Sequence, residues 1–244
     1  MDMHTHMSIH MQGDIPMNDH TDFLALLQSV DAFFPIGAFT LSNGLEDYVV
    51  RERIGSPVEL ASYLRGFLSI FPYGDLGVLS LAYQSAENPS ELLRLDGLAH
   101  AMKGAKEVRI GSSRMCSRYL KAREAMGDMP DGLRWYQEQI REKRATGVHP
   151  VALGIYGAEH KVEEERLLMM YGYSILSAIV NNAVKLVPLG QLDGQRVLYD
   201  AFPSLVQAVK KSMEISSEDL GVSGTGYEIH CMNHEILYSR QYMS

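Results

Sequence analysis

Residues 163–188 read EEERLLMMYGYSILSAIVNNAVKLVP, and this stretch decides the fold class. It opens on consecutive glutamates, which suit the positive end of a helix dipole, and it closes on a proline, which cannot continue a helix. Between them the apolar residues run nearly all the way round a helix, as in buried helices. We therefore predict a central core helix from Leu167 to Val187. Its longest apolar run, Leu167–Val180, is shorter than the ~20 residues that a bilayer-spanning helix needs, so we expect no membrane partner.

Helical patterns continue on both sides of this stretch. Ser56, Pro57 and Glu59 form a capping box with proline at the first helical position, and apolar residues follow at helical intervals. No run of strict apolar alternation is long enough for a sheet, and the hairpin signal at Asn43 and Gly44 is followed at once by helical spacing. We predict an all-α fold over residues 22–235, a single globular domain of about ten helices packed around the central apolar helix.

The composition narrows the class of protein. The chain has 244 residues, 46% of them apolar, which suffices for a sizeable core. Its formal net charge of −8 and pI near 5.6 argue against nucleic acid and anionic membranes as partners, since both need a basic face. Cys116 and Cys231 lie outside any CxxC pattern, which fits a reducing compartment. We expect a cytoplasmic location.

Residues 31–48, DAFFPIGAFTLSNGLEDY, form the least helix-like apolar segment. Pro35 fixes its own φ and Gly37 frees the backbone to turn, so Phe33 and Phe34 can project in different directions. A loop with this much aromatic surface needs cover. Either the rest of the chain supplies it, or a partner protein shares the task.

Residues 106–126 predict a helix with two unlike faces. One face holds mostly small residues, and the other is a basic strip on an acidic protein, formed by Arg109, Arg114, Arg118, Lys121 and Arg123. A solvated face is the ordinary interpretation. An anchor for an acidic partner is the alternative, because arginine is enriched among the residues that dominate binding energy.

The N-terminal residues 1–21 are rich in histidine and methionine and lack any apolar period, which indicates a flexible tail. Imidazole and thioether groups suit late first-row metals, but nothing fixes these ligands in space, so a plain disordered terminus is the simpler interpretation. His230 and His234 would share a helix face. The weak candidates for a metal site are therefore His4, His6, His10, His230 and His234.

The C-terminal residues 236–244 differ from an ordinary frayed end. They keep Tyr238, Arg240 and Tyr242 within a few residues of the terminus. Tyrosine and arginine are the side chains that most often dominate binding energy, so we predict a docking tail.

Motifs for common chemistries are missing from the sequence. It has no P-loop, no G-x-S-x-G, no HExxH zinc motif and no Glu-x-x-His pair of the kind that builds di-iron sites in helical bundles. We expect a binding or scaffolding protein rather than an enzyme. A helical metal-binding protein or metalloenzyme, using the N-terminal histidines or His230 and His234, is the alternative.

Several segments, in this order, resemble the urease accessory protein UreF family. They are DAFFPIGAFTLSNGLEDYV, KEVRIGSSRMCSRYL, HPVALGIYGAEH, VKLVPLGQLDGQRVL and the final HEILYSRQYMS. The resemblance covers nearly the whole chain after residue 21. It implies an all-α protein that tends to dimerise, is not an enzyme and binds no cofactor stably. Such proteins join a UreD/UreH-type protein and a UreG-type GTPase to deliver nickel, in transit, to apo-urease.

The resemblance also implies which residues bind partners. Phe39 occupies a position where some relatives have tyrosine. Together with the neighbouring aromatic residues, the expected partner-binding residues are Phe33, Phe34, Pro35, Gly37, Phe39, Glu46, Arg109, His234, Tyr238, Ser239, Arg240 and Tyr242. We hypothesise that the segment HEILYSRQYMS is mobile in the free protein and becomes ordered on assembly, against the protein itself or its partners, with Arg240 as the anchor.

Overall fold

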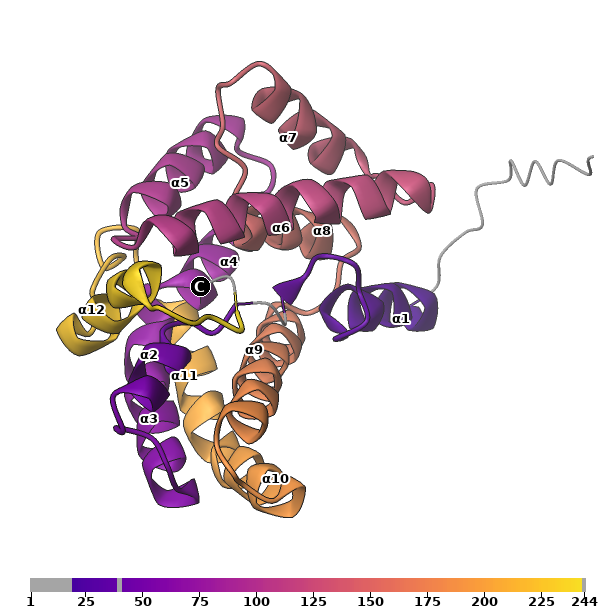
Figure 1. Ribbon diagram of the computed structural model, residues 1–244. Coiled ribbons are helices and arrows are strands. Elements are labelled where there is room, and N and C mark those ends of the chain that lie inside the picture. The colour runs from indigo at the N-terminus through magenta and orange to yellow at the C-terminus, as the bar shows by residue number, and fades with distance from the viewer. Residues whose placement is uncertain (1–18, 39–40, 243–244) are drawn as a thin grey trace, which may run out of the picture.

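The computed structural model describes residues 19–38 and 41–242, and within those ranges it contains helices and loops but no strand (Figure 1). The predicted all-α fold with a single domain is confirmed. The helices are α1 (Asp19–Val30), α2 (Leu45–Val50), α3 (Pro57–Ile70), the 3-10 helix η2 (Phe71–Tyr73), α4 (Asp75–Gln84), α5 (Pro89–Ala101), α6 (Lys106–Ala125), α7 (Asp131–Arg141), α8 (His149–Glu159), α9 (Glu164–Leu186), α10 (Gln191–Asp200), α11 (Phe202–Glu214), α12 (Thr225–Asn233) and the 3-10 helix η3 (His234–Ile236).

The predicted core helix is α9. It packs against α1, α2, α3, α4, α8, α10 and α11, and Figure 1 shows it running from the middle of the molecule down to α10. Leu167, Leu176 and Ile179 are among its buried side chains. The central apolar helix therefore lies where the sequence predicts it.

By length and composition alone, α9 would also pass as a membrane-spanning helix, with a mean hydropathy of 1.4 over its most apolar window. In the fold, 50% of that window is buried against other helices. The core helix of a soluble protein passes the same test, so the apolar character of α9 is explained by its packing.

The helix α8 is buried along most of its length, from His149 to Gly157. It approaches α4 closely, because a Cβ on Gly154 would lie 2.8 Å from the carbonyl oxygen of Leu79 and 2.9 Å from the Ala82 Cβ. His149 begins this helix, and burial lowers the pKa of its ring to about 4. The ring therefore packs as a neutral group, edge to face with Tyr119.

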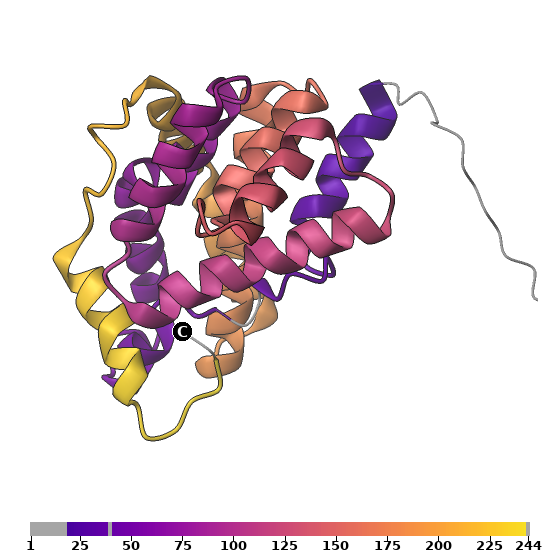
Figure 2. The ribbon, with the colours of Figure 1, turned by 90° about the horizontal axis from the view of Figure 1, so that it is seen from above.

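The helix α6 lies across the molecule and holds one terminal segment at each end. Figures 1 and 2 show α12 and the C-terminal segment beside its N-terminal end, and α1 beside its C-terminal end. Glu107 and Arg123, near the two ends of α6, make the polar contacts to these segments. The tail and α1 are thus held at opposite ends of one helix.

Arg123 is buried, with 1% of its side chain exposed, so the prediction that it belongs to an exposed basic strip is wrong. Its guanidinium donates to Asp128 at 2.8 Å and to the carbonyl oxygen of Ala25 on α1 at 2.8 Å. It also lies 4.2 Å from the ring centroid of Tyr156. The physical reason is helical spacing, because Arg123 follows the buried Tyr119 by four residues and shares its face.

His160 completes this buried anchor of α1. Its Nδ1 lies 2.8 Å from Asp22 on α1 and its Nε2 lies 3.2 Å from Asp128. Burial alone would lower the pKa of His160, but the carboxylates of Asp128 and Asp22 outweigh burial and raise it. Burial would likewise raise the pKa of Asp128, and hydrogen bonds from His160 and Tyr156 lower it.

These shifts predict how the anchoring of α1 depends on pH. Because the folded-state pKa of His160 is raised, its contribution is fully present below the unfolded value of about 6.5 and is lost as pH rises through the folded value. Amide hydrogen exchange around Leu26, corrected for the intrinsic rate, is expected to accelerate over that interval relative to amides of α9. His160→Gln should remove the pH dependence. Unchanged relative protection of α1 in the parent chain would contradict the assignment.

Candidate functional site

Helices α2 and α6 meet the C-terminal segment at a group of charges that we call the tail clasp, formed by Glu46, Glu107, His234 and Arg240. Glu46 and His234 are buried, and Arg240 is partly exposed. His234 is completely buried, with its Nε2 2.9 Å from Glu46 and its Nδ1 2.6 Å from Glu107. Each ring nitrogen therefore faces a carboxylate oxygen from a different helix. The histidine thus joins α2 to α6.

The same two carboxylates also hold the residues that follow η3. Arg240 Nη1 donates to Glu107 Oε1 at 2.7 Å. The backbone N–H groups of Gln241 and Tyr242 donate to Glu46 at 2.6 and 3.1 Å. In this structure the tail is therefore docked on the chain itself, mostly through backbone donors and one guanidinium.

The docked tail still presents side chains outward. Tyr238 is fully exposed, and Ser239 is exposed beside it. The Arg240 side chain is 42% exposed even though it is paired with Glu107. A partner can therefore contact the tail without first unfolding anything beneath it.

Gly44 sets the geometry at the start of α2. It adopts a φ of 77°, in the left-handed region, directly before the first helical residue. A Cβ at this position would lie 3.0 Å from the backbone nitrogen of Cys231 on α12. Glycine therefore lets α12 approach α2 closely enough for His234, which follows α12, to reach Glu46.

The histidine pair expected as a weak metal candidate does not converge on one point. His230 stacks on the ring of Tyr48 with centroids 3.5 Å apart, and its Nδ1 lies 2.6 Å from Asp47. His234 instead faces Glu46 and Glu107. Among the described residues, no group of three or more histidine, cysteine or acidic side chains is arranged to hold a metal ion. His4, His6 and His10 lie outside the described residues.

Phe33 and Phe34 have opposite environments. Phe34 is buried, with its ring 5.7 Å from that of Tyr119, and it belongs to the core. Phe33 is 96% exposed. The predicted partner-binding loop therefore contributes one aromatic ring to the core and one to the surface.

The other residues expected to bind partners have mixed positions. Pro35 is exposed, while Gly37 is buried with a φ of 77°. Arg109 donates to the carbonyl oxygens of Lys103 and Gly104, so it closes the turn between α5 and α6. Phe39 lies outside the described residues.

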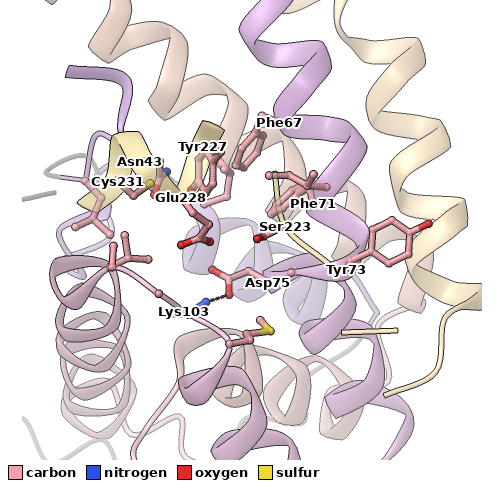
Figure 3. A pocket seen from close by; sticks show the side chains of 18 of the residues that line it. Asn43, Phe67, Phe71, Tyr73, Asp75, Lys103, Ser223, Tyr227, Glu228 and Cys231 are labelled. Atoms are coloured by element: carbon pink, nitrogen blue, oxygen red, sulfur yellow. Dashed lines mark hydrogen bonds and ion pairs between the residues drawn. The ribbon is translucent and has the colours of Figure 1, made fainter. Parts of the chain in front are cut away.

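A cavity of about 120 Å³ lies near the tail clasp, between η2, α6, α9 and α12 (Figure 3). Phe67, Phe71 and Tyr227 form part of an apolar wall, and an ion pair between Asp75 and Lys103 lines the other side. Sequence reasoning missed this cavity, because its polar groups come from distant segments with no motif spacing. Its rim also holds a third charged group.

That third group is Glu228, a second carboxyl, which interacts electrostatically with Lys103. Burial raises the pKa of Glu228, and Lys103 and the Gly104 N–H offset part of this rise. The cavity thus combines an apolar wall with a polar edge.

The buried thiols are not poised for nucleophilic chemistry. Burial raises the pKa of Cys231 to about 12, and burial also raises the pKa of Cys116. The thiolate is the reactive form, so both side chains remain inert thiols near neutral pH. The described residues thus bring together ion pairs and packing surfaces rather than an activated nucleophile.

The sequence is similar to those of known proteins over most of its length. The family model described as UreF matches residues 54–202. The chain is 37% identical over 227 residues to a urease accessory protein UreF of Haemophilus influenzae (strain ATCC 51907 / DSM 11121 / KW20 / Rd), covering 92% of this chain and 96% of the relative. It is 36% identical over 223 residues to the protein of that name from Actinobacillus pleuropneumoniae serotype 5b (strain L20), covering 90% and 98%. It is 34% identical over 226 residues to the one from Bacillus sp. (strain TB-90), covering 91% and 98%.

Proposed function

The chain belongs to the UreF family of urease accessory proteins, and on this premise we propose that it is a non-catalytic adaptor in urease maturation. It assembles in the cytoplasm with a UreD/UreH-type protein and a UreG-type GTPase. The complex regulates GTP-dependent insertion of nickel into apo-urease. The chain binds no cofactor stably, and nickel reaches it only in transit.

The tail clasp is the observation that carries this proposal. A fully buried histidine fixes the base of the tail, while the residues beyond η3 are held by a half-exposed ion pair and two backbone hydrogen bonds. An exposed ion pair contributes only about 0.2–1 kcal/mol. The tail therefore has a firm origin and a weakly held end, which suits a segment that is handed to a partner during assembly.

The expected homodimer has a suitable surface elsewhere. Tyr173 on α9 and Tyr199 on α10 are 48% and 70% exposed, and both rings lie against Phe202, with centroids 6.1 and 5.4 Å away. Exposed aromatic clusters of this kind are enriched at protein interfaces. We propose that two copies of the chain contact each other through this cluster.

A GTPase assay tests the non-catalytic part of the proposal. The purified chain alone is expected to show no GTP turnover above buffer, because the function requires it to act on a separate GTPase. Addition of the UreD/UreH-type protein and the chain to the UreG-type GTPase should change the hydrolysis rate of that enzyme. Turnover by the chain alone, in a preparation shown by mass spectrometry to be free of other GTPases, would contradict the proposal.

A further inference from the structure

The exposed ring of Phe33 stands on a fixed base. The Asp31 carboxylate accepts a hydrogen bond from the Phe33 N–H at 2.7 Å, and the Asp31 carbonyl accepts one from the Phe34 N–H at 3.0 Å. Arg118 on α6 donates to the carbonyl oxygen of Ile36 at 3.2 Å. With Phe34 buried below, the loop holds Phe33 in place although almost none of its surface is covered.

Phe33 stands at the edge of a groove between α1 and the C-terminal end of α6. Leu24 and Leu27 line one side, and Ala125 and Met126 line the other. Leu24, Leu27 and Met126 are 59%, 45% and 45% exposed. Together with Phe33 they form a continuous apolar surface, which we call the Phe33 groove. Apolar patches of this kind on a soluble protein mark binding sites more often than chance.

Two cations of α6 lie beside the groove. Arg118 donates to the carbonyl oxygen of Ile36 in the Phe33 loop, and Lys121 precedes Ala122, which lines the groove. Both side chains are exposed, and neither forms an ion pair with a residue that the structure describes. The carboxylate that lines the groove, Asp31, accepts a hydrogen bond from the Phe33 N–H. The two cations stand out because the whole chain carries a formal net charge of −8. An unpaired basic edge beside an apolar groove complements a segment that is apolar on one side and acidic on its flank.

We propose that the Phe33 groove docks an apolar segment of a partner protein whose flank carries carboxylates. The inference rests on the proposed function, because it assigns this segment to one of the two accessory proteins of the complex. Phe33 inserts between apolar side chains of the partner, and the basic edge of α6 pairs with its carboxylates. Because hydrogen bonds already fix the loop backbone at Phe33, binding has to order only its side chain, which suits this residue as an anchor.

A second copy of the chain fits this groove poorly. A symmetric contact places the same patch of both copies face to face, so the basic edge of one copy would meet the basic edge of the other. Like charges placed opposite one another oppose such a contact. The aromatic cluster of Tyr173, Tyr199 and Phe202 is the surface proposed above for self-association.

Binding measurements with matched variants test the groove. Phe33→Ala removes the aromatic anchor and Lys121→Glu reverses a charge at the edge of the groove. As controls, Val58→Ala shortens an exposed apolar side chain on α3, and Lys185→Glu reverses an exposed charge on α9. The purified UreD/UreH-type and UreG-type proteins, separately and mixed, serve as probes in biolayer interferometry. We expect both groove variants to weaken binding of the same partner at least tenfold, and both control variants to bind like the parent. Added salt should weaken partner binding by the parent chain more than partner binding by the Lys121→Glu variant.

The outcomes separate this inference from the proposed function. If the parent chain binds the partners and both groove variants bind within twofold of it, the inference is wrong and the adaptor function stands. If Phe33→Ala alters self-association in size-exclusion chromatography and leaves partner binding intact, the groove belongs to a second copy and the inference is also wrong. If the parent chain binds neither partner, the proposed function fails.

Discussion

Truncation of the chain after Ile236 is expected to abolish urease activation while leaving the helical fold in place. The deletion removes Arg240 and the backbone donors of Gln241 and Tyr242, but His234 still links Glu46 and Glu107. The loss to folding should be small, because the removed residues are mostly exposed. Activation is measured as urease activity in cells that carry the truncated chain as their only copy.

Two controls separate the tail from general damage. Arg240→Ala should reproduce most of the loss, whereas Arg166→Ala, which removes an exposed arginine paired with Glu163 on the surface, should activate urease normally. Circular dichroism should give the same helical content for all of these proteins. Normal activation by the truncated chain would show that the segment after η3, including Arg240, has no part in function.

Replacement of Asp96 by alanine is expected to destabilise the fold by at least about 3 kcal/mol. Asp96 is 1% exposed and lies on α5. Its carboxylate accepts hydrogen bonds from the hydroxyl of Tyr136, from the backbone and hydroxyl of Thr146, and from the N–H groups of Gly147 and Val148. Each buried donor left without an acceptor costs about 1–3 kcal/mol, and several are left at once.

The backbone donors that lose their acceptor lie in residues 146–148, which lead into α8. We therefore expect the loss of these hydrogen bonds to disturb the packing of α8 in the core. A loss of this size is a large fraction of the 5–15 kcal/mol that typically holds a domain together. Urea unfolding followed by circular dichroism measures it. Asp96→Asn, which keeps one acceptor oxygen, should lose less, and Asp200→Ala at an exposed position should lose almost nothing. A change below 1 kcal/mol for Asp96→Ala would contradict the role of this carboxylate.

Local patterns predicted the elements of the fold well. The apolar surface of α9 and the S-P-V-E start of α3 are both readable over a few turns, because capping and helix amphipathicity are local properties. In α3 the Ser56 hydroxyl accepts from the Glu59 N–H as expected, and Glu59 accepts from the Gly55 N–H. The central place of α9 also followed from its composition, since a helix that is apolar nearly all round has to be covered on most sides.

Contacts between distant segments were not readable. The family resemblance identified Glu46, His234 and Arg240 as separate partner-binding candidates. Nothing in the sequence shows that these residues meet at Glu107. The buried carboxylate of Asp96 was missed for the same reason, because its partners lie 40 to 52 residues away. The burial of Arg123 follows from its spacing four residues after Tyr119, but its contact with Ala25, 98 residues away, does not.

The conformation of the Phe33 loop could be predicted only in part from the sequence. Its proline and glycine predicted a shaped turn, and the pattern left open whether Phe33 and Phe34 face the core or a partner. The structure buries one and exposes the other. Which ring points inward depends on Tyr119 and Arg123 of α6, so the distinction needed the tertiary packing.

Co-elution of the purified components tests the central claim most directly. The UreD/UreH-type protein and the UreG-type GTPase are run on a size-exclusion column with and without this chain, in the presence of GTP and nickel. An adaptor predicts that the two proteins elute together only when the chain is present, and that all three then share one peak. If the two proteins associate equally well without the chain, or if the chain elutes alone from the mixture, it is not the adaptor of this complex.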